Sequence, residues 1–383
     1  MSESRRQTTG YFGGHVVLGL VSASLGPTLP ALAAGLHRDP ESLGLLFTAR
    51  GLGYLLGSLA CGRLYDRRPA HPLLITAIVM LAASMAVVPW MGSRAGLLAI
   101  MLVIGGAQGL LDVGNNSTLV RVHGPKVAPF MNALHCFYGV GAMISPVVVE
   151  AAGSLAWAYA ALAIALLPAA LWLIFVPSPT TSRTSASASE GEDVAAPPRP
   201  AIVAAFVVLF AFCQGGEAGF GGWIYVIASD AGFDEGAAAR LLSSFWAAFT
   251  LGRVLSIVVA TRVRPAHMLA ADLLGSLLGL GVVLLVPGAI GLWLGTLVLG
   301  LALASVFPAA LSLAGTHVEL DGAVTSRIFV GASVGTMAMP WLIGESFVLG
   351  PRAPMLALLL DLLIAAGVFV AIVTRRSAPR ARG

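Results

Sequence analysis

Charged side chains are scarce in this sequence. Lys, Arg, Asp and Glu make up 10% of the 383 residues, whereas hydrophobic residues make up 57%. Soluble domains carry roughly 25% charged residues. Together with a mean hydropathy of +0.89, this scarcity excludes a chain solvated mainly by water and predicts a protein embedded in a lipid bilayer.

Cysteine is rare, and catalytic signatures are missing. Cys61, Cys136 and Cys213 each fall inside an apolar stretch and are odd in number, which argues against a disulfide framework and favours packing. The sequence contains no H-E-x-x-H, no G-x-S-x-G and no phosphate-binding loop. It therefore predicts neither an enzyme nor a resident metal or cofactor.

Long apolar stretches are what the sequence has in abundance. A stretch of about 20 residues is enough for a helix to cross a bilayer core of roughly 30 Å. We predict twelve spans, at residues 11–35, 43–64, 72–91, 95–120, 129–152, 154–176, 201–228, 237–261, 266–287, 289–315, 323–348 and 352–374. The first is too long for a signal-peptide core, so we expect it to remain in a multi-pass protein.

Basic residues fall mostly on one side of this predicted membrane topology. The main groups are Arg63–Arg68, Arg121–Lys126, Arg262–Arg264 and Arg375–Arg382. The positive-inside rule then places both termini in the cytoplasm and the chain in the cell membrane, either the inner or the plasma membrane. This placement explains the net charge of +4, so no nucleic acid is predicted as a partner. Apart from the lipid bilayer, neither the segment 177–200 nor the termini suggest an obligate protein partner.

The segment 177–200 divides the chain into two halves. It is rich in Ser, Thr, Ala and Pro and can neither cross a membrane nor bury a core. We expect an N-terminal six-helix bundle at 1–176, a flexible cytoplasmic linker at 177–200 and a C-terminal six-helix bundle at 201–383. The tetrapeptides 68–71 and 264–267 both read Arg-Pro-Ala-His in equivalent loops, which supports a repeat. The predicted fold class is all-α integral membrane, with two pseudo-symmetric bundles.

Asp112 is the strongest pointer to function. It lies inside the apolar run 95–120, where a carboxylate is costly and is seldom kept without a task. Gln108 before it and Asn115 and Asn116 after it fall at helical spacing and share roughly its face. This polar stripe predicts a hydrated cavity within the membrane.

A second polar group is predicted in the other half. Gln214 and Glu217 are three residues apart on the span 201–228, with Trp223 nearby. Amide and carboxylate groups bind sugar hydroxyls, and an aromatic ring can cover the apolar face of a pyranose. For Trp223 the alternative is an anchor at the membrane surface.

On the span 129–152, Asn132 and His135 share a face. The candidate substrate-binding residues are therefore Gln108, Asn115, Asn116, Asn132, His135, Gln214, Glu217 and Trp223.

The loop after the second span reads Gly62-Arg63-Leu64-Tyr65-Asp66-Arg67-Arg68 and resembles the signature loop of the major facilitator superfamily. The resemblance implies the major facilitator fold. Asp66 and Arg67 in this loop, together with Arg50 on the preceding span, are then candidate gating residues. Asp66 can face the positive N-terminal end of another helix near Thr325 and Ser326.

A further resemblance runs through Gly109–Asn116 and Asn132–Ala142, and includes Glu217–Trp223, Arg50–Tyr54 and Gly331–Gly335. These segments resemble the fucose-permease and sodium-dependent-glucose-transporter branch of the superfamily. The resemblance implies that Asp112 is an ion-coupling acid. The second acid of that permease has no match on the first span, where only His15 and small hydroxyl residues occur. Glu217 is the candidate replacement.

The resulting hypothesis is a secondary active transporter that carries a sugar or similar small polar solute together with H⁺ or Na⁺ by alternating access. Three alternatives remain open: export of a small amphipathic drug or metabolite, a non-transporting membrane sensor, and a static ion pair between Asp112 and Arg50. We do not predict a site role for Asp272, Glu345 or Asp361, which lie on other spans.

Overall fold

The computed structural model describes residues 2–179 and 200–374, apart from the side chains at positions 62, 63, 66 and 67. The described chain is helical and contains twelve segments long and apolar enough to cross a membrane. The helices are α1 (Glu3–Gly35), α2 (Leu45–Arg67), α3 (Ala70–Val87), α4 (Arg94–His123), α5 (Ala128–Ala151), α6 (Leu155–Ile174), α7 (Pro200–Asp230), α8 (Glu235–Ala260), α9 (Pro265–Leu285), α10 (Gly288–Leu303), α11 (Val306–His317), α12 (Gly322–Ser346) and α13 (Ala353–Thr374). The all-helical, twelve-span fold is therefore confirmed.

The tenth span differs in detail from the prediction of one continuous helix at 289–315. It is built from α10 and α11, which are separated by a turn at Ala304 and Ser305. At this break the Ser305 hydroxyl lies 2.8 and 2.9 Å from the two carboxylate oxygens of Asp272 on α9 and donates to them. The break thus supplies a hydrogen-bond donor to an otherwise buried acid.

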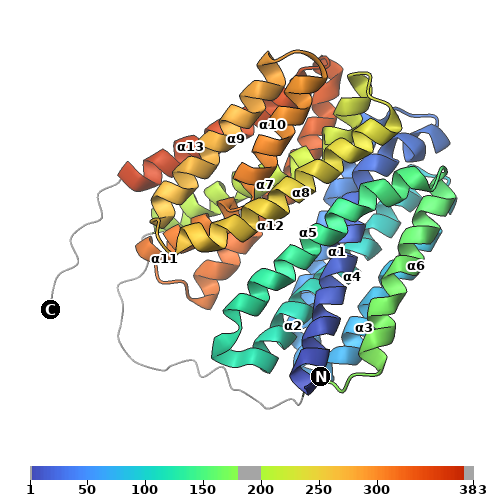
Figure 1. Ribbon diagram of the computed structural model, residues 1–383, viewed down its shortest axis with the longest axis vertical. Helices are drawn as coiled ribbons and strands as arrows, with labels where there is room; N and C mark the ends of the chain where they lie inside the picture. Colours follow the sequence, from blue (N-terminus) through green and yellow to red (C-terminus); the bar gives the residue numbers. More distant parts are fainter. Residues whose placement is uncertain (1, 180–199, 375–383) are drawn as a thin grey trace.

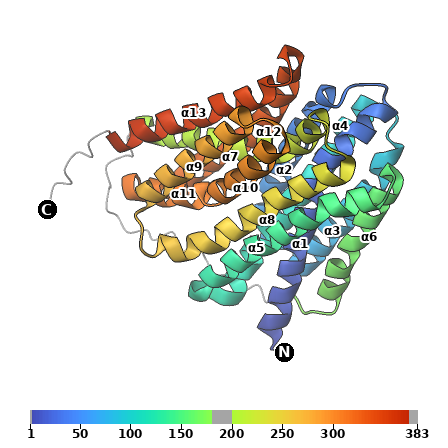
Figure 2. The ribbon, with the colours of Figure 1, turned by 45° about the horizontal axis from the view of Figure 1, so that its top comes forward.

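Helices α1–α6 and helices α7–α13 form two groups that can be followed by colour, blue to green and yellow to red, in both ribbon views (Figures 1 and 2). Corresponding pairs pack in each group: α1 with α5 and α7 with α12, α2 with α4 and α8 with α10, α3 with α6 and α9 with α13. The repeated Arg-Pro-Ala-His tetrapeptide leads into the third helix of each group, α3 and α9. The two halves therefore share one packing plan.

Glycine makes this packing close. A Cβ atom at Gly19 or Gly141 would overlap backbone atoms across the α1–α5 contact, and one at Gly331 or Gly335 would do so across the α7–α12 contact. Small residues at such positions let membrane helices approach until their backbones touch. The glycines inside these spans thus serve helix packing.

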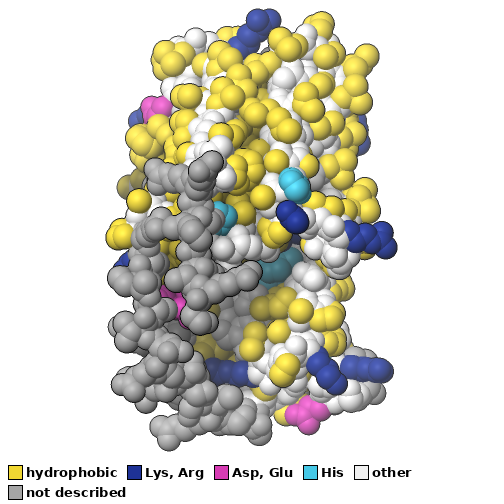
Figure 3. Space-filling view, turned by 90° about the vertical axis from the view of Figure 1, so that its left-hand side faces the viewer, with side chains coloured by type: hydrophobic (Ala, Val, Ile, Leu, Met, Phe, Trp, Pro, Cys, Tyr) yellow, Lys and Arg dark blue, Asp and Glu magenta, His cyan; other side chains and the backbone are white. Residues whose placement is uncertain are grey.

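The outer surface suits a lipid environment. Large hydrophobic side chains are exposed on the outside of most helices, including Leu171, Leu278 and Leu360, and the Trp90 and Trp157 rings are more than two-thirds exposed at helix ends. Tryptophan is typical of the membrane–water boundary. Hydrophobic side chains also cover much of the face in Figure 3, where Lys and Arg are few and separated.

The two groups of helices meet away from the chain ends. Twelve crossings put the start of α1 and the end of α13 on one face, which we call the chain-end face; the opposite one is the far face. Toward the far face, Gly26 lies against the Gly222 carbonyl, and Gly236 against Glu150. The last residues of α8, Ile257–Ala260, are exposed on the chain-end side. The α5 and α8 ribbons also diverge toward their chain-end tips (Figure 1).

Candidate functional site

Asp112 lies where α1, α2 and α4 meet. Its Oδ1 is 3.3 Å from Nε2 of His15 and accepts a 2.9 Å hydrogen bond from Nδ2 of Asn116. Its Oδ2 accepts a short hydrogen bond from the Tyr54 hydroxyl. The side chain remains 24% exposed, so the carboxylate is surrounded by hydrogen-bond donors yet is still accessible.

A hydrogen bond from Asn115 determines which nitrogen of the His15 ring carries the proton. The Asn115 amide donates from Nδ2 to Nδ1 of His15 over 3.2 Å, so Nδ1 acts as an acceptor and the ring proton is on Nε2. Nε2 is buried and has no hydrogen bond of its own, with Asp112 as the acidic group beside it. A small rotation of either side chain would therefore let the Nε2–H group donate a hydrogen bond to the Asp112 carboxylate.

The predicted stripe on α4 faces α1 and α2. Gln108 is buried and donates from Nε2 to the Ser22 hydroxyl on α1 over 2.9 Å. Asn115 is buried against His15, while Asn116 is partly exposed and bonds back to Asp112. These side chains lie together with Asp112, as their spacing predicted, although Gln108 and Asn115 are occupied by contacts within their own half.

Arg50 on α2 is not the ion-pair partner of Asp112. Its Nη1 donates to the Ser22 carbonyl oxygen over 3.0 Å, and the guanidinium lies 5.6 Å from the centre of the Phe47 ring. Among the side chains that the structure describes, His15 with Asp112 is the only pair of opposite charge type within 4.0 Å. A static Asp112–Arg50 link is therefore absent.

The other half contributes a second acid and a second arginine. On α7, Gln214 and Glu217 share a face and are 3.4 Å apart, from Nε2 to Oε2. Arg253 on α8 is close enough to act electrostatically on Glu217. Its guanidinium lies 4.8 Å from the centre of the Phe249 ring, and its Nε is buried without a partner. Glu217 and Arg253 therefore attract each other without forming a direct ion pair among the described contacts.

Helix α5 joins these two groups. The His135 ring is 5.6 Å from the His15 ring in an edge-on arrangement, and Asn132, one turn toward the chain-end face, is exposed. The Tyr138 ring is 6.0 Å from the Trp246 ring of α8. Arg50, Glu217 and Arg253 all act electrostatically on the Tyr138 hydroxyl, which therefore lies among the charged groups of both halves.

Trp223 does not join the other candidates. Its side chain is fully buried, its indole Nε1 donates to the Pro340 carbonyl oxygen over 2.7 Å, and its ring packs between Phe47 and Phe347. It is neither at the membrane surface nor open to a ligand in this conformation. We therefore leave Trp223 out of the site proposed below.

The predicted latch residues Asp66 and Arg67 have side chains that lie outside the described residues.

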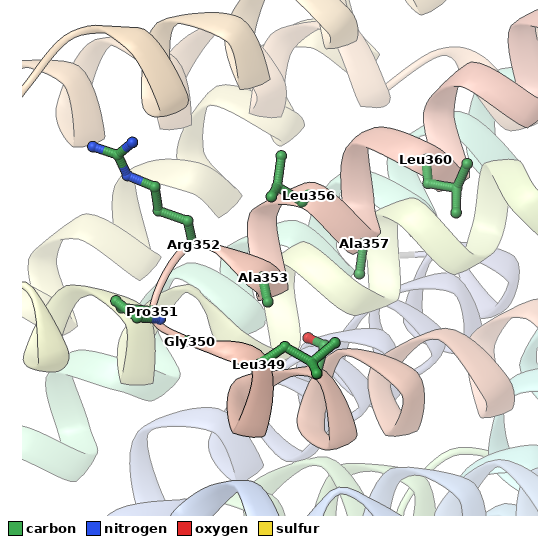
Figure 4. Close-up of a pocket in the computed structure, with 9 residues that line it drawn as sticks. Leu349, Gly350, Pro351, Arg352, Ala353, Leu356, Ala357 and Leu360 are labelled. Atoms are coloured by element: carbon green, nitrogen blue, oxygen red, sulfur yellow. The ribbon is translucent and has the colours of Figure 1, made fainter.

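A groove of about 570 Å³ lies beside the turn between α12 and α13, and the residues that line it include Leu349, Ala353, Leu356 and Leu360 (Figure 4). It shares no residue with the central group, and apart from Arg352 its labelled side chains are apolar.

Comparison with known proteins fits this geometry. A sequence profile of the Major Facilitator Superfamily matches residues 11–340, most of the chain. The chain belongs to the major facilitator superfamily. It is therefore a membrane transporter and not an enzyme.

Similar proteins and structures support this membership. The mouse sodium-dependent glucose transporter 1A is 29% identical over 395 positions, covering 93% of this chain and 92% of the relative. The human sodium-dependent glucose transporter 1 is 29% identical and covers 85% of this chain and 71% of the relative. The nucleoside transporter NupG shares the fold, with a TM-score of 0.76 at 14% identity over 98% of this chain and 100% of that one.

Sequence reasoning missed two of the residues around Asp112 in this transporter. In the sequence, His15 is recognised only as one of the few polar residues of the first span, and Tyr54 only as part of a segment that resembles the family. A histidine in an apolar span is a detectable signal, because it is costly in hydrocarbon for the same reason as Asp112. Tyr54 gave no such signal, because tyrosine is common in membrane helices.

Proposed function

We propose that this transporter is an ion-coupled symporter that carries a sugar or similar small polar solute by alternating access. The observation that carries the proposal is the Asp112 carboxylate, partly exposed between the helices and held by His15, Tyr54 and Asn116. A charge held in a low-dielectric interior responds strongly to any cation that neutralises it. Binding of the coupling ion there would change the relative free energies of the two access states.

The surroundings of Asp112 favour a proton as the coupling ion. Each of its three neighbours presents an N–H or O–H donor to the carboxylate. Sodium needs several oxygen ligands, whereas a proton needs only the carboxylate itself. Sodium remains the second candidate, because similar proteins are named sodium-dependent transporters.

A sugar is favoured as substrate by the mixed amide, carboxylate and imidazole groups of Gln108, Asn132, His135, Gln214 and Glu217. Hydroxyl groups can both donate to and accept from such side chains. The Tyr138 and Trp246 rings lie beside them, at the contact between the two halves. The names of similar proteins, the mouse and human sodium-dependent glucose transporters, support the same class of substrate.

The proposed transport cycle also involves the two bundles, the linker and the latch residues. The two six-helix bundles, 1–176 and 201–383, would move against each other, with the 177–200 linker and both termini in the cytoplasm. Asp66 and Arg67 would then act as a latch on the cytoplasmic side.

The test uses the purified chain in proteoliposomes, with uptake of labelled glucose driven by an imposed proton gradient or by an imposed sodium gradient. We expect accumulation under the proton gradient. His15→Gln should abolish it, since an amide cannot take up a proton at one atom and pass another to Asp112, as an imidazole can, while His267→Gln, exposed at the start of α9, should behave as wild type.

Accumulation that is driven by sodium and survives in His15→Gln would assign sodium as the ion. Extrusion of solute against its gradient would instead support the exporter alternative. Absence of any movement of glucose or of its sugar-acid analogue, including exchange, would refute the sugar proposal.

A further inference from the structure

Arg50 is a charged side chain near the site that has no carboxylate within 4.0 Å among the described residues. The side chains that act on it electrostatically include the hydroxyls of Tyr138 and Tyr159. An arginine inside a membrane protein is costly unless an anion or several acceptors surround it.

One of the N–H donors of Arg50 has a hydrogen-bond partner among the described residues. A guanidinium carries five N–H donors in a fixed planar fork. One of its nitrogens donates to the Ser22 carbonyl oxygen at 3.0 Å, and the Phe47 ring covers the guanidinium at 5.6 Å. Among the described residues, no carboxylate lies within 4.0 Å of it. The side chain is partly exposed, so its free donors are open to a ligand.

Arg50 lies beside the residues proposed to bind the solute. It shares Ser22 with Gln108: Arg50 bonds the backbone carbonyl, and Gln108 bonds the hydroxyl. It also acts on Tyr138, which reaches the groups of the other half. A solute bound among these side chains would therefore place one end close to the guanidinium.

We propose that Arg50 binds a carboxylate of the transported solute, so that the substrates of this transporter are sugar acids such as hexuronates. The inference rests on the proposed function and narrows its substrate class. The planar fork of arginine matches a carboxylate with two parallel hydrogen bonds, which lysine cannot reproduce. A neutral sugar would leave the charge of Arg50 uncompensated, whereas a sugar acid balances it.

The experiment compares glucuronate with glucose, which share the ring and differ at one end. Binding is followed by the thermal unfolding temperature of the purified chain across a titration of each compound. We expect wild type to bind glucuronate more tightly than glucose. Arg50→Gln should raise the Kd for glucuronate by about ten-fold or more and should raise the Kd for glucose less. Arg50→Lys should fall between wild type and Arg50→Gln.

Arg352→Gln is the matched control, because Arg352 lines the peripheral groove in Figure 4 and should leave both Kd values unchanged. Equal binding of both sugars by wild type, or an equal loss of both in Arg50→Gln, would overturn the inference.

A third compound, lactate, separates the two proposals. If glucose binds and glucuronate does not, the Arg50 inference fails while the sugar proposal stands. If lactate binds through Arg50 and neither sugar binds, a carboxylate site exists but the sugar proposal fails, and with it the sugar-acid assignment. Binding of glucuronate that depends on Arg50 supports both.

Discussion

At the scale of single residues, the Asp112 carboxylate depends on donors that come from other helices. Tyr54 on α2 and His15 on α1 both face it, and only Asn116 belongs to its own helix. A hydrogen bond to a charged group contributes about 1.5–3 kcal/mol. Small changes at these neighbours should therefore alter ion coupling more than they alter the fold.

Tyr54→Phe removes one donor from Asp112 and keeps the ring. We expect gradient-driven accumulation of labelled sugar to fall by about ten-fold, because the charged carboxylate loses a hydrogen bond. Tyr65→Phe is the control on the same helix, since the Tyr65 hydroxyl is buried and has no hydrogen-bond partner among the described residues. Equal uptake by the two variants would show that the Tyr54 bond has no part in coupling.

Part of this site could be predicted from the sequence, and part could not. The stripe at Gln108, Asp112, Asn115 and Asn116 follows from helical spacing alone, and the structure brings these side chains together. The partner His15 is almost a hundred residues away along the chain, so no local pattern connects it to Asp112. Trp223 was a reasonable aromatic candidate, but its direction depends on α12, which spacing within α7 does not reveal.

At the scale of elements, glycines determine how closely the helices pack. A Cβ atom at Gly57 on α2 would overlap the Gly106 carbonyl oxygen of α4, and backbone atoms cannot rotate away as a side chain can. Hydropathy alone predicted the twelve spans, because membrane thickness fixes their length. The break at Ser305 was not predictable in the same way, since it is linked to Asp272 on another helix.

Gly57→Ala should destabilise the protein by about 1–3 kcal/mol through overpacking, seen as a lower thermal unfolding temperature in detergent. Gly281→Ala on α9 is the control, because nothing lies within 4 Å of the Cβ atom it would add. That variant should unfold at or above the wild-type temperature, since alanine favours helix more than glycine does. A stable Gly57→Ala protein would mean that α2 and α4 are not so closely packed.

At the scale of the whole molecule, the two halves touch toward the far face and part toward the chain-end face. Gly139 packs against Thr250 where α5 crosses α8, and Thr48 on α2 donates to the Met337 carbonyl oxygen on α12 over 2.9 Å. Figure 3 shows a hollow near the middle of the surface, with a histidine side chain visible in it. The structure therefore corresponds to a state open toward the chain ends.

Asn132→Cys, in a chain whose three native cysteines are replaced by alanine, tests this open state. We expect a membrane-impermeant maleimide to label it rapidly from the chain-end face, because the Asn132 side chain is exposed. Thr48→Cys, packed against α12, should react slowly from either side. Rapid labelling at position 48 from the far face, with protection at 132, would show that the opposite state dominates in the membrane.

The most direct test of the account is Asp112→Asn, which keeps the size of the side chain and one acceptor oxygen and removes its charge. In proteoliposomes, exchange of labelled for unlabelled substrate needs only binding and the change of access, whereas accumulation against a gradient also needs the coupling ion. The account predicts that Asp112→Asn retains exchange and loses accumulation under every imposed ion gradient. Accumulation at the wild-type level would contradict it.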